Sequence, residues 1–130
     1  MTVQTRTELR LSALPKTWII DVDGVIVRHN GHLGPEGDRL LPGVREFWDR
    51  IPAEDTIIVV SARKEHERAA TLATLEGWGL RCSAALFGLP PGERILVNDA
   101  KPSGLVTAHA VSVPRDAGLA GVSIVIDPRL

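Results

Sequence analysis

The chain has too few cysteines for a disulfide framework, because Cys82 is the only one among its 130 residues. A lone cysteine among apolar neighbours is typical of a small core residue. No apolar run approaches the roughly 18 residues that a membrane-spanning helix needs. The polar, mixed-charge segment 1–10 also lacks the continuous apolar stretch of a signal peptide. We therefore expect no membrane association and a cytoplasmic location.

The chain also lacks an excess of charge of either sign. Its 15 Lys and Arg residues and 16 Asp and Glu residues give a formal net charge of −1, which offers no electrostatic reason to bind nucleic acid. Hydrophobic residues make up 44% of the chain, enough for a core. A chain of this length buries roughly two-thirds of its unfolded surface. We expect one domain over 1–130, in which 1–15 can form a peripheral N-terminal segment.

Runs of β-branched residues alternate with segments of helical periodicity. This alternation predicts an α/β fold with a mostly parallel sheet flanked by helices. The expected strands are 17–21, 56–60, a short one within 80–87, 95–97, 108–113 and 122–126. Helices are expected from Pro42 to just before Pro52 and over 64–76. The Gly- and Pro-rich segment 28–39 is predicted to be a loop or small flap, and no stretch of about 50 residues is left for a cap domain.

The segment Asp21-Val22-Asp23-Gly24-Val25 is the most informative feature, because two carboxylates directly follow an apolar strand. Alternate side chains of an extended segment share a face, so Asp21 and Asp23 should crowd each other. Like charges at close range raise one pKa unless a cation intervenes. A divalent metal ion would remove this conflict, and Gly24 would let the backbone turn sharply beside a ligand.

Polar residues follow two further apolar runs. Ser61 comes directly after 56–60, and Asn98 and Asp99 follow 95–97, with Lys101 just beyond. Because the carboxyl ends of parallel strands meet at one edge of a sheet, where α/β folds bind ligands, we expect these side chains to converge with those of the first segment.

These residues resemble the motifs of the haloacid dehalogenase-like (HAD) superfamily, most of whose members are Mg-dependent phosphatases. Residues 21–25 match its first motif, Asp-x-Asp-Gly followed by Thr or Val. Ser61 resembles the second motif, and Asp99 the acidic fourth motif. The chain departs from the pattern at Asn98, where a second acid is usual, and at Leu89, where a lysine often stands. The resemblance covers most of the chain and is nearest to small capless members, so it implies a Rossmann-like HAD fold without a cap.

The resemblance and the chemistry of the residues imply the same roles. Asp21 would attack phosphorus and form an aspartyl-phosphate, and Asp23 would act as general acid and base. The expected Mg²⁺ ligands are Asp21, Asp23 through its backbone carbonyl, and Asp99. The expected phosphate-binding groups are Gly24, Ser61, Ala62, Arg63 and Lys101. The expected substrate is a small phosphorylated metabolite, with a sugar phosphate favoured.

Several alternatives stay open. Leu89 and Asn98 also suit a non-catalytic HAD-fold domain that binds a phosphorylated ligand. An uncapped site would equally admit a nucleotide or a macromolecular phosphate, unless a second copy in a homo-oligomer or the 28–39 loop covers it. Clustered acids with Ser and Lys also occur in receiver domains, although there the acidic pair and the phosphorylated Asp lie on different strands. His29 and His32 are as consistent with a plain surface loop as with substrate contact, and zinc is disfavoured because no acidic or Cys partner stands at ligand spacing.

Overall fold

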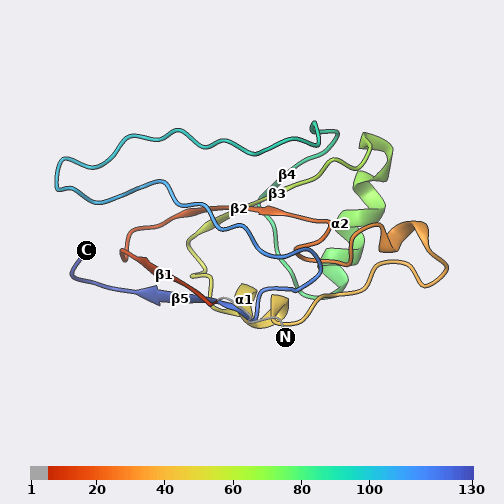
Figure 1. Ribbon diagram of the computed structural model, residues 1–130, viewed down its shortest axis with the longest axis horizontal. Coiled ribbons are helices and arrows are strands. Elements are labelled where there is room, and N and C mark those ends of the chain that lie inside the picture. Colours follow the sequence, from red (N-terminus) through yellow and green to blue (C-terminus); the bar gives the residue numbers. More distant parts are fainter. Residues whose placement is uncertain (1–5) are drawn as a thin grey trace.

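The two strongest apolar runs form neighbouring parallel strands, β2 (Thr17–Asp21) and β3 (Thr56–Val60), in the computed structural model, which describes residues 6–130 (Figure 1). Strand β4 (Ala84–Leu86) pairs in parallel with the other side of β3, so the strand order is β2-β3-β4. The register pairs Asp21 with Val60, and Val60 with Leu86. All three strands therefore end at the same edge, as the sequence predicts.

A second sheet joins the two ends of the chain. Strands β1 (Thr7–Leu11) and β5 (Val122–Ile126) run parallel and pair over their full length. Strand β1 lies within the 1–15 segment, where no strand is expected from the sequence, and residues 1–5 lie outside the described part. The pattern Thr-Glu-Leu-Arg-Leu alternates polar and apolar residues, and Leu11 is buried in the core. This short period-2 signal identifies a half-buried strand.

Two helices contribute buried side chains to the core. Helix α1 (Val44–Asp49) starts two residues after Pro42, and helix α2 (Arg68–Gly77) continues the 3₁₀ turn η2 (Glu65–Glu67). A second 3₁₀ turn, η1 (Gly31–Leu33), lies within the 28–39 loop. Both expected helices are thus confirmed. No helix within 6–130 has the length and apolar character needed to cross a membrane.

The core lies on one face of the three-stranded sheet. Trp18 of β2 packs edge-to-face on Phe47 of α1, with ring centroids 5.6 Å apart. By contrast Ile19, which points to the other face, is 52% exposed. Parallel sheets of the doubly wound kind are normally covered on both faces. The structure is an α/β fold with parallel strands in two small sheets. The expected α/β class is confirmed, whereas the Rossmann-like HAD fold stays a prediction.

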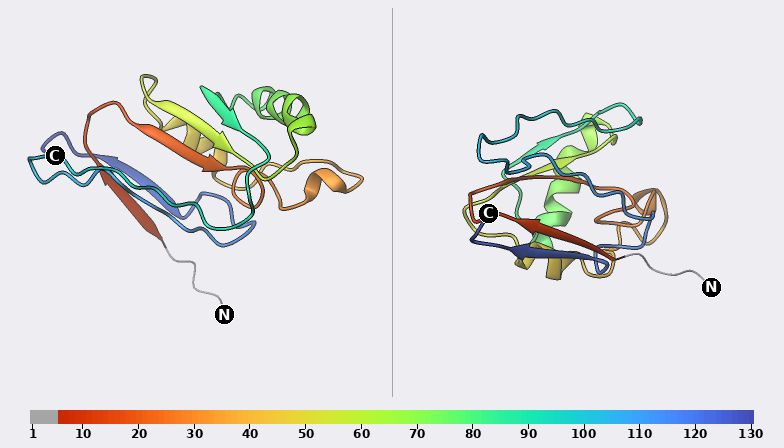
Figure 2. Two further views of the ribbon diagram at one scale, coloured as in Figure 1. Left: turned by 90° about the horizontal axis from the view of Figure 1, so that it is seen from above. Right: turned by 60° about the vertical axis from the view of Figure 1, so that its left-hand side comes forward.

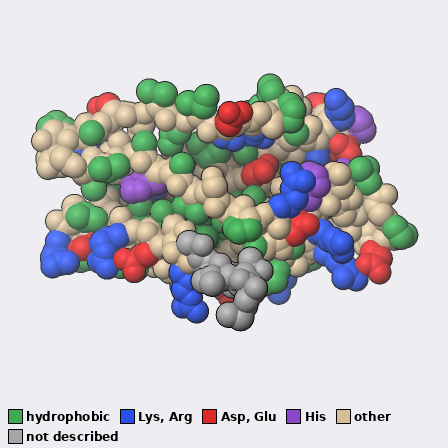
Figure 3. All heavy atoms as spheres, in the orientation of Figure 1, with side chains coloured by type: hydrophobic (Ala, Val, Ile, Leu, Met, Phe, Trp, Pro, Cys, Tyr) green, Lys and Arg blue, Asp and Glu red, His purple; other side chains and the backbone are tan. Residues whose placement is uncertain are grey.

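The expected strands at 95–97 and 108–113 are wrong, because the whole segment 88–113 has no regular secondary structure. Ile95 and Val97 are 86% and 89% exposed. The segment runs along one long side of the molecule and turns back at the end near the C-terminus, and exposed hydrophobic side chains line that edge (Figures 1 and 3). Strand propensity depends on pairing and packing, and 95–97 has no partner strand here.

Candidate functional site

The loop after β2 is held by its own backbone and by buried apolar residues. The Val22 carbonyl accepts hydrogen bonds from the amides of Ile26 and Val27 at 3.0 and 3.1 Å. The side chains of Val22, Ile26 and Val27 are fully buried. Gly24 takes a φ of +83°, and a Cβ there would lie 3.3 Å from the Cγ of Arg115. The predicted sharp turn at Gly24 is confirmed, and it fixes Asp21 and Asp23 on either side of a buried valine.

Asp21 carries a half-buried carboxylate at the end of β2. Burial raises its pKa, and the negative charge of Asp23 acts in the same direction, while the Val22 amide and the charges of Arg94 and His29 oppose it. The predicted repulsion between the two acids therefore contributes less to the raised pKa than burial does. Among residues 6–130, no other side chain forms a hydrogen bond or ion pair with Asp21. Its carboxylate is thus available to a ligand.

Asp23, by contrast, is paired with Arg63. The guanidinium binds it through two bonds, Nε to Oδ2 at 3.0 Å and Nη2 to Oδ1 at 2.9 Å. It binds Asp38 in the same way, at 3.1 and 2.8 Å, and donates a fifth bond to Thr71 at 3.0 Å. The Arg63 amide bonds to the Ser61 hydroxyl oxygen at 2.9 Å. Burial lowers the pKa of Arg63, but its hydrogen bonds to the two carboxylates outweigh burial and raise it.

This arrangement bears on two expectations. A metal ion is expected beside Asp21 and Asp23, and Arg63 already supplies one positive charge to Asp23, so the metal ion stays a prediction. Arg63 was also expected to bind a phosphoryl oxygen. All five of its N–H donors are engaged, two to each carboxylate and one to Thr71, and its side chain is 4% exposed. Arg63 therefore holds the site together and has no N–H left for a substrate anion.

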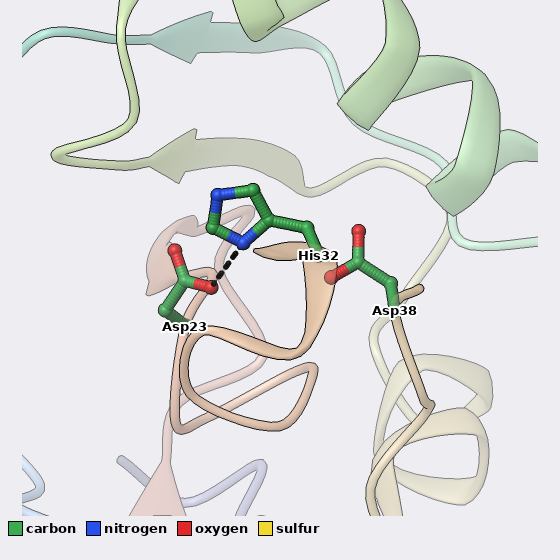
Figure 4. Close-up of side chains that lie close together, drawn as sticks. All are labelled: Asp23, His32 and Asp38. Carbon is green, nitrogen blue, oxygen red and sulfur yellow. Dashed lines mark ion pairs between the residues drawn. The ribbon is translucent and has the colours of Figure 1, made fainter. Parts of the chain in front are cut away.

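The 28–39 loop reaches the site through His32 and Asp38. His32 Nδ1 lies 3.9 Å from Asp23 Oδ1 (Figure 4). The other ring nitrogen, Nε2, lies 3.4 Å from Glu67 Oε1. Asp38, Glu67 and Thr71 were not foreseen as site residues. The sequence shows only that Asp38 is an acid in the same Gly-rich loop as His32. It does not show that Asp38 pairs with Arg63, because that pairing depends on how the loop folds back.

Three of the remaining predicted residues, Ser61, Ala62 and Gly24, lie in the loops after β2 and β3. Ser61 is fully buried after β3, and Ala62 beside it is exposed. The Gly24 amide is already bonded to the Val27 carbonyl at 2.7 Å, so Gly24 contributes its conformation and not a free donor. Among the expected phosphate-binding groups near β2 and β3, the Ser61 hydroxyl and the Ala62 amide donate no hydrogen bond within residues 6–130.

Asp99 and Lys101 are not brought to this site. Both are exposed in the 88–113 segment, at a turn that the Lys101 amide closes by bonding to the Leu105 carbonyl at 3.1 Å. That turn lies at the opposite end of the molecule from the carboxyl ends of β2 and β3 (Figures 1 and 2). The expected ligand set of Asp21, Asp23 and Asp99 is therefore not assembled here, because the strand that should have carried Asp99 does not form.

A hollow of about 320 Å³ lies next to the site, within the 28–39 loop. Its ionisable lining residues are Arg28, His29, Glu36 and Arg39. It does not include Asp21 or Asp23. Comparisons of the chain with protein-family models, with curated proteins and with solved structures found no match. The site is therefore interpreted from its own geometry.

Proposed function

We propose that this chain is a HAD-type phosphatase that acts on a small phosphorylated metabolite, with a sugar phosphate favoured. One observation carries the proposal. Asp21 ends a strand at the carboxyl edge of the sheet, half-buried and without a side-chain partner among residues 6–130, while the acid two residues away is fully engaged. A carboxylate that is partly desolvated and unpaired is a stronger nucleophile than one that a guanidinium neutralises.

The chemistry follows from the two acids. An Asp21 oxygen attacks phosphorus, the bond to the substrate oxygen breaks, and an aspartyl-phosphate forms. Asp23 must carry a proton when the substrate binds. It gives this proton to the leaving oxygen and then takes one from the water that attacks the phosphoenzyme, which releases phosphate and restores both acids. Arg63 keeps the Asp23 carboxylate in one orientation through both steps. Ser61 and the Ala62 amide are the groups proposed to donate hydrogen bonds to the phosphoryl oxygens.

Magnesium fits these residues in part. Mg²⁺ prefers oxygen ligands in octahedral geometry and keeps several waters, and the Asp21 carboxylate and the Asp23 backbone carbonyl are the two expected ligands in the loop after β2. The third expected ligand, Asp99, lies elsewhere. When bound, Mg²⁺ would offset the negative charge shared by the acids and the phosphate. Its requirement remains part of the proposal, to be measured directly.

The proposal also includes a docked position for the 88–113 segment. Strand β2 is an edge strand, and an unpaired edge accepts a further strand. The run Ile95–Val97 is apolar, β-branched at both ends and exposed. If it added to the β2 edge in parallel, its end would bring Asp99 and Lys101 toward Asp21 and complete the Rossmann-like arrangement that the resemblance implies.

The test is phosphate release from an aryl phosphate and from panels of sugar phosphates, nucleotides and phosphopeptides, with Mg²⁺ and with excess chelator. We expect Mg²⁺-dependent turnover, fastest on a sugar phosphate. Turnover that survives chelation would remove the metal from the proposal. Faster turnover of nucleotides or phosphopeptides would instead make a nucleotide or a macromolecular phosphate the substrate, which an uncapped site also admits.

A non-catalytic binding domain is the second candidate, and the engagement of Arg63 favours it. Arg63 neutralises Asp23 and Asp99 lies elsewhere, so the described site holds its side chains in place without the full set of expected catalytic groups. This candidate predicts no turnover of any substrate in the panel but measurable binding of a phosphorylated sugar by calorimetry. Turnover that Asp21→Asn abolishes would exclude it.

A further inference from the structure

We propose that Asp23, His32 and Asp38 form a binding site for a divalent transition metal such as Zn²⁺, separate from the Mg²⁺ requirement proposed above. Each of the three residues offers a ligand atom, and these atoms all lie within 4.8 Å of one another. Figure 4 shows the His32 ring leaning toward the Asp23 carboxylate, with Asp38 on its other side. One imidazole nitrogen with two carboxylates suits zinc or a similar ion better than Mg²⁺, which prefers oxygen alone.

His32 provides the independent observation that points to a ligand. Its Nδ1 is buried, and among residues 6–130 it has no hydrogen-bond partner. Buried polar atoms are normally satisfied, so an exception requires an explanation such as a missing ion. The Nδ1 atom faces Asp23 Oδ1 at 3.9 Å, a separation that a metal ion between the two atoms would shorten slightly.

Glu67 holds the ring in the orientation that a metal ligand needs. Its Oε1 lies 3.4 Å from His32 Nε2, and its Oε2 accepts the Lys64 amide at 2.8 Å, which fixes the carboxylate. A proton on Nε2 facing Glu67 leaves the lone pair of Nδ1 free. Metal-binding histidines almost always give their second N–H to a carboxylate, carbonyl or water in this way.

The charges around His32 call for a cation. Asp23, Asp38 and Glu67 bring three negative charges, and Arg63 brings one positive charge. A divalent ion would balance the remainder while His32 stays neutral. Arg63 does not block the ion, because each carboxylate oxygen of Asp23 and Asp38 accepts one N–H and an ionised carboxylate has about four acceptor positions.

Such an ion would fasten the 28–39 loop to the loop after β2. Two ligands, His32 and Asp38, come from the former, and Asp23 comes from the latter. The inference does not depend on phosphatase activity, because it concerns binding of the metal alone. It does predict that zinc reduces turnover if Asp23 acts as the general acid and base.

The test is calorimetric titration of the metal-free full chain with Zn²⁺, with Co²⁺ absorption as a second probe. We expect one Zn²⁺ per chain. His32→Ala and Asp38→Asn should each lower the affinity at least tenfold, and Glu67→Gln should lower it roughly tenfold as an outer partner. His29→Ala, in the same loop but outside the group, is the matched control and should bind as the wild type does.

Two outcomes of the titration would overturn the proposal. One is the absence of Zn²⁺ binding to the wild type, and the other is loss of binding in His29→Ala with retention in His32→Ala, which would move the ion toward Asp21. Nitrogen NMR of the wild-type imidazoles keeps the test decisive if a variant misfolds. Zn²⁺ should shift the Nδ1 signal of one histidine, and an unchanged set of histidine signals would reject the site.

Discussion

Arg63 and Asp23 face each other as a two-point pair, with Nε and Nη2 donating to the two carboxylate oxygens at 3.0 and 2.9 Å. One partner follows β3 and the other follows β2, so the pair ties together the ends of neighbouring strands. The same guanidinium reaches Asp38 in the 28–39 loop. Because such bidentate pairs fix direction as well as distance, one side chain sets the relative position of three segments.

Loss of Arg63 should therefore be costly. Arg63→Met leaves two largely buried carboxylates uncompensated, and we expect it to lower the free energy of unfolding by about 3–5 kcal/mol. Arg63→Lys should recover little, because an ammonium cannot make two bidentate pairs. Arg45→Met, an exposed position on α1, is the control and should change stability by about 0.5 kcal/mol or less. Urea unfolding measures all three, and equal stability of the two Met variants would show that the pairs contribute nothing net.

Asp21→Asn should abolish phosphatase turnover by at least about 10³-fold, because the covalent route loses its nucleophile. Asp23→Asn should also be severe but should still allow slow trapping of the phosphoenzyme. Asp49→Asn removes an exposed carboxylate on α1 and serves as the control with unchanged kcat. Near-normal turnover in Asp21→Asn together with loss in Asp23→Asn would reverse the assignment of the two acids.

Asp21→Asn should also raise the free energy of unfolding at neutral pH. Burial raises the pKa of Asp21 above its ordinary value, so the folded state holds the proton more tightly than the unfolded state. Stability from this group is present below the unfolded pKa of about 3.9 and is lost as pH rises through the raised folded pKa. Asp21→Asn, which cannot ionise, should therefore exceed the wild type in unfolding free energy at pH 7, with the gap narrowing toward pH 4. A less stable variant at pH 7 would contradict the cause given for the shift.

Much of the sheet could be predicted from local sequence, because pattern and pairing agree there. The runs 17–21 and 56–60 are apolar, β-branched and adjacent in the sheet, and both form strands over the expected residues. The run 95–97 has the same local character but no partner, so it stays extended and exposed. Strand β1 was missed because only Leu9 and Leu11 mark its buried face.

The site could be predicted only as far as residues that directly follow strands. Asp21, Asp23 and Ser61 lie where the sequence indicated. The role of Arg63 could not be predicted, because it depends on Asp38, which the 28–39 loop brings back from 25 residues earlier in the chain. Zinc was disfavoured at His32 for lack of an acidic partner at ligand spacing, yet folding brings two acids beside it.

Replacement by alanine should lower the free energy of unfolding by very different amounts at two glycines that have nearly the same φ. Gly118 and Gly79 have φ of +78° and +77°, so the conformational strain of a Cβ, about 1–2 kcal/mol, is common to both. A Cβ at Gly118 would lie 2.1 Å from the Pro42 carbonyl oxygen, whereas nothing lies within 4 Å of one at Gly79. We expect Gly79→Ala to show the strain alone in urea unfolding, and Gly118→Ala to lose much more or fail to fold. Equal losses would mean that Pro42 moves away without cost.

Docking of the 88–113 segment gives the last prediction. If Ile95–Val97 adds to the β2 edge when a phosphoryl group is bound, its amides should exchange hydrogen slowly with Mg²⁺ and a phosphate mimic, and quickly without them. Lys101 would then contact the phosphoryl group, so Lys101→Ala should raise KM and lower kcat. Lys64→Ala, exposed at the start of η2, should do little. Fast exchange of these amides in both conditions, together with a neutral Lys101→Ala, would show that the segment stays extended and that catalysis, if present, uses the acids after β2 without it.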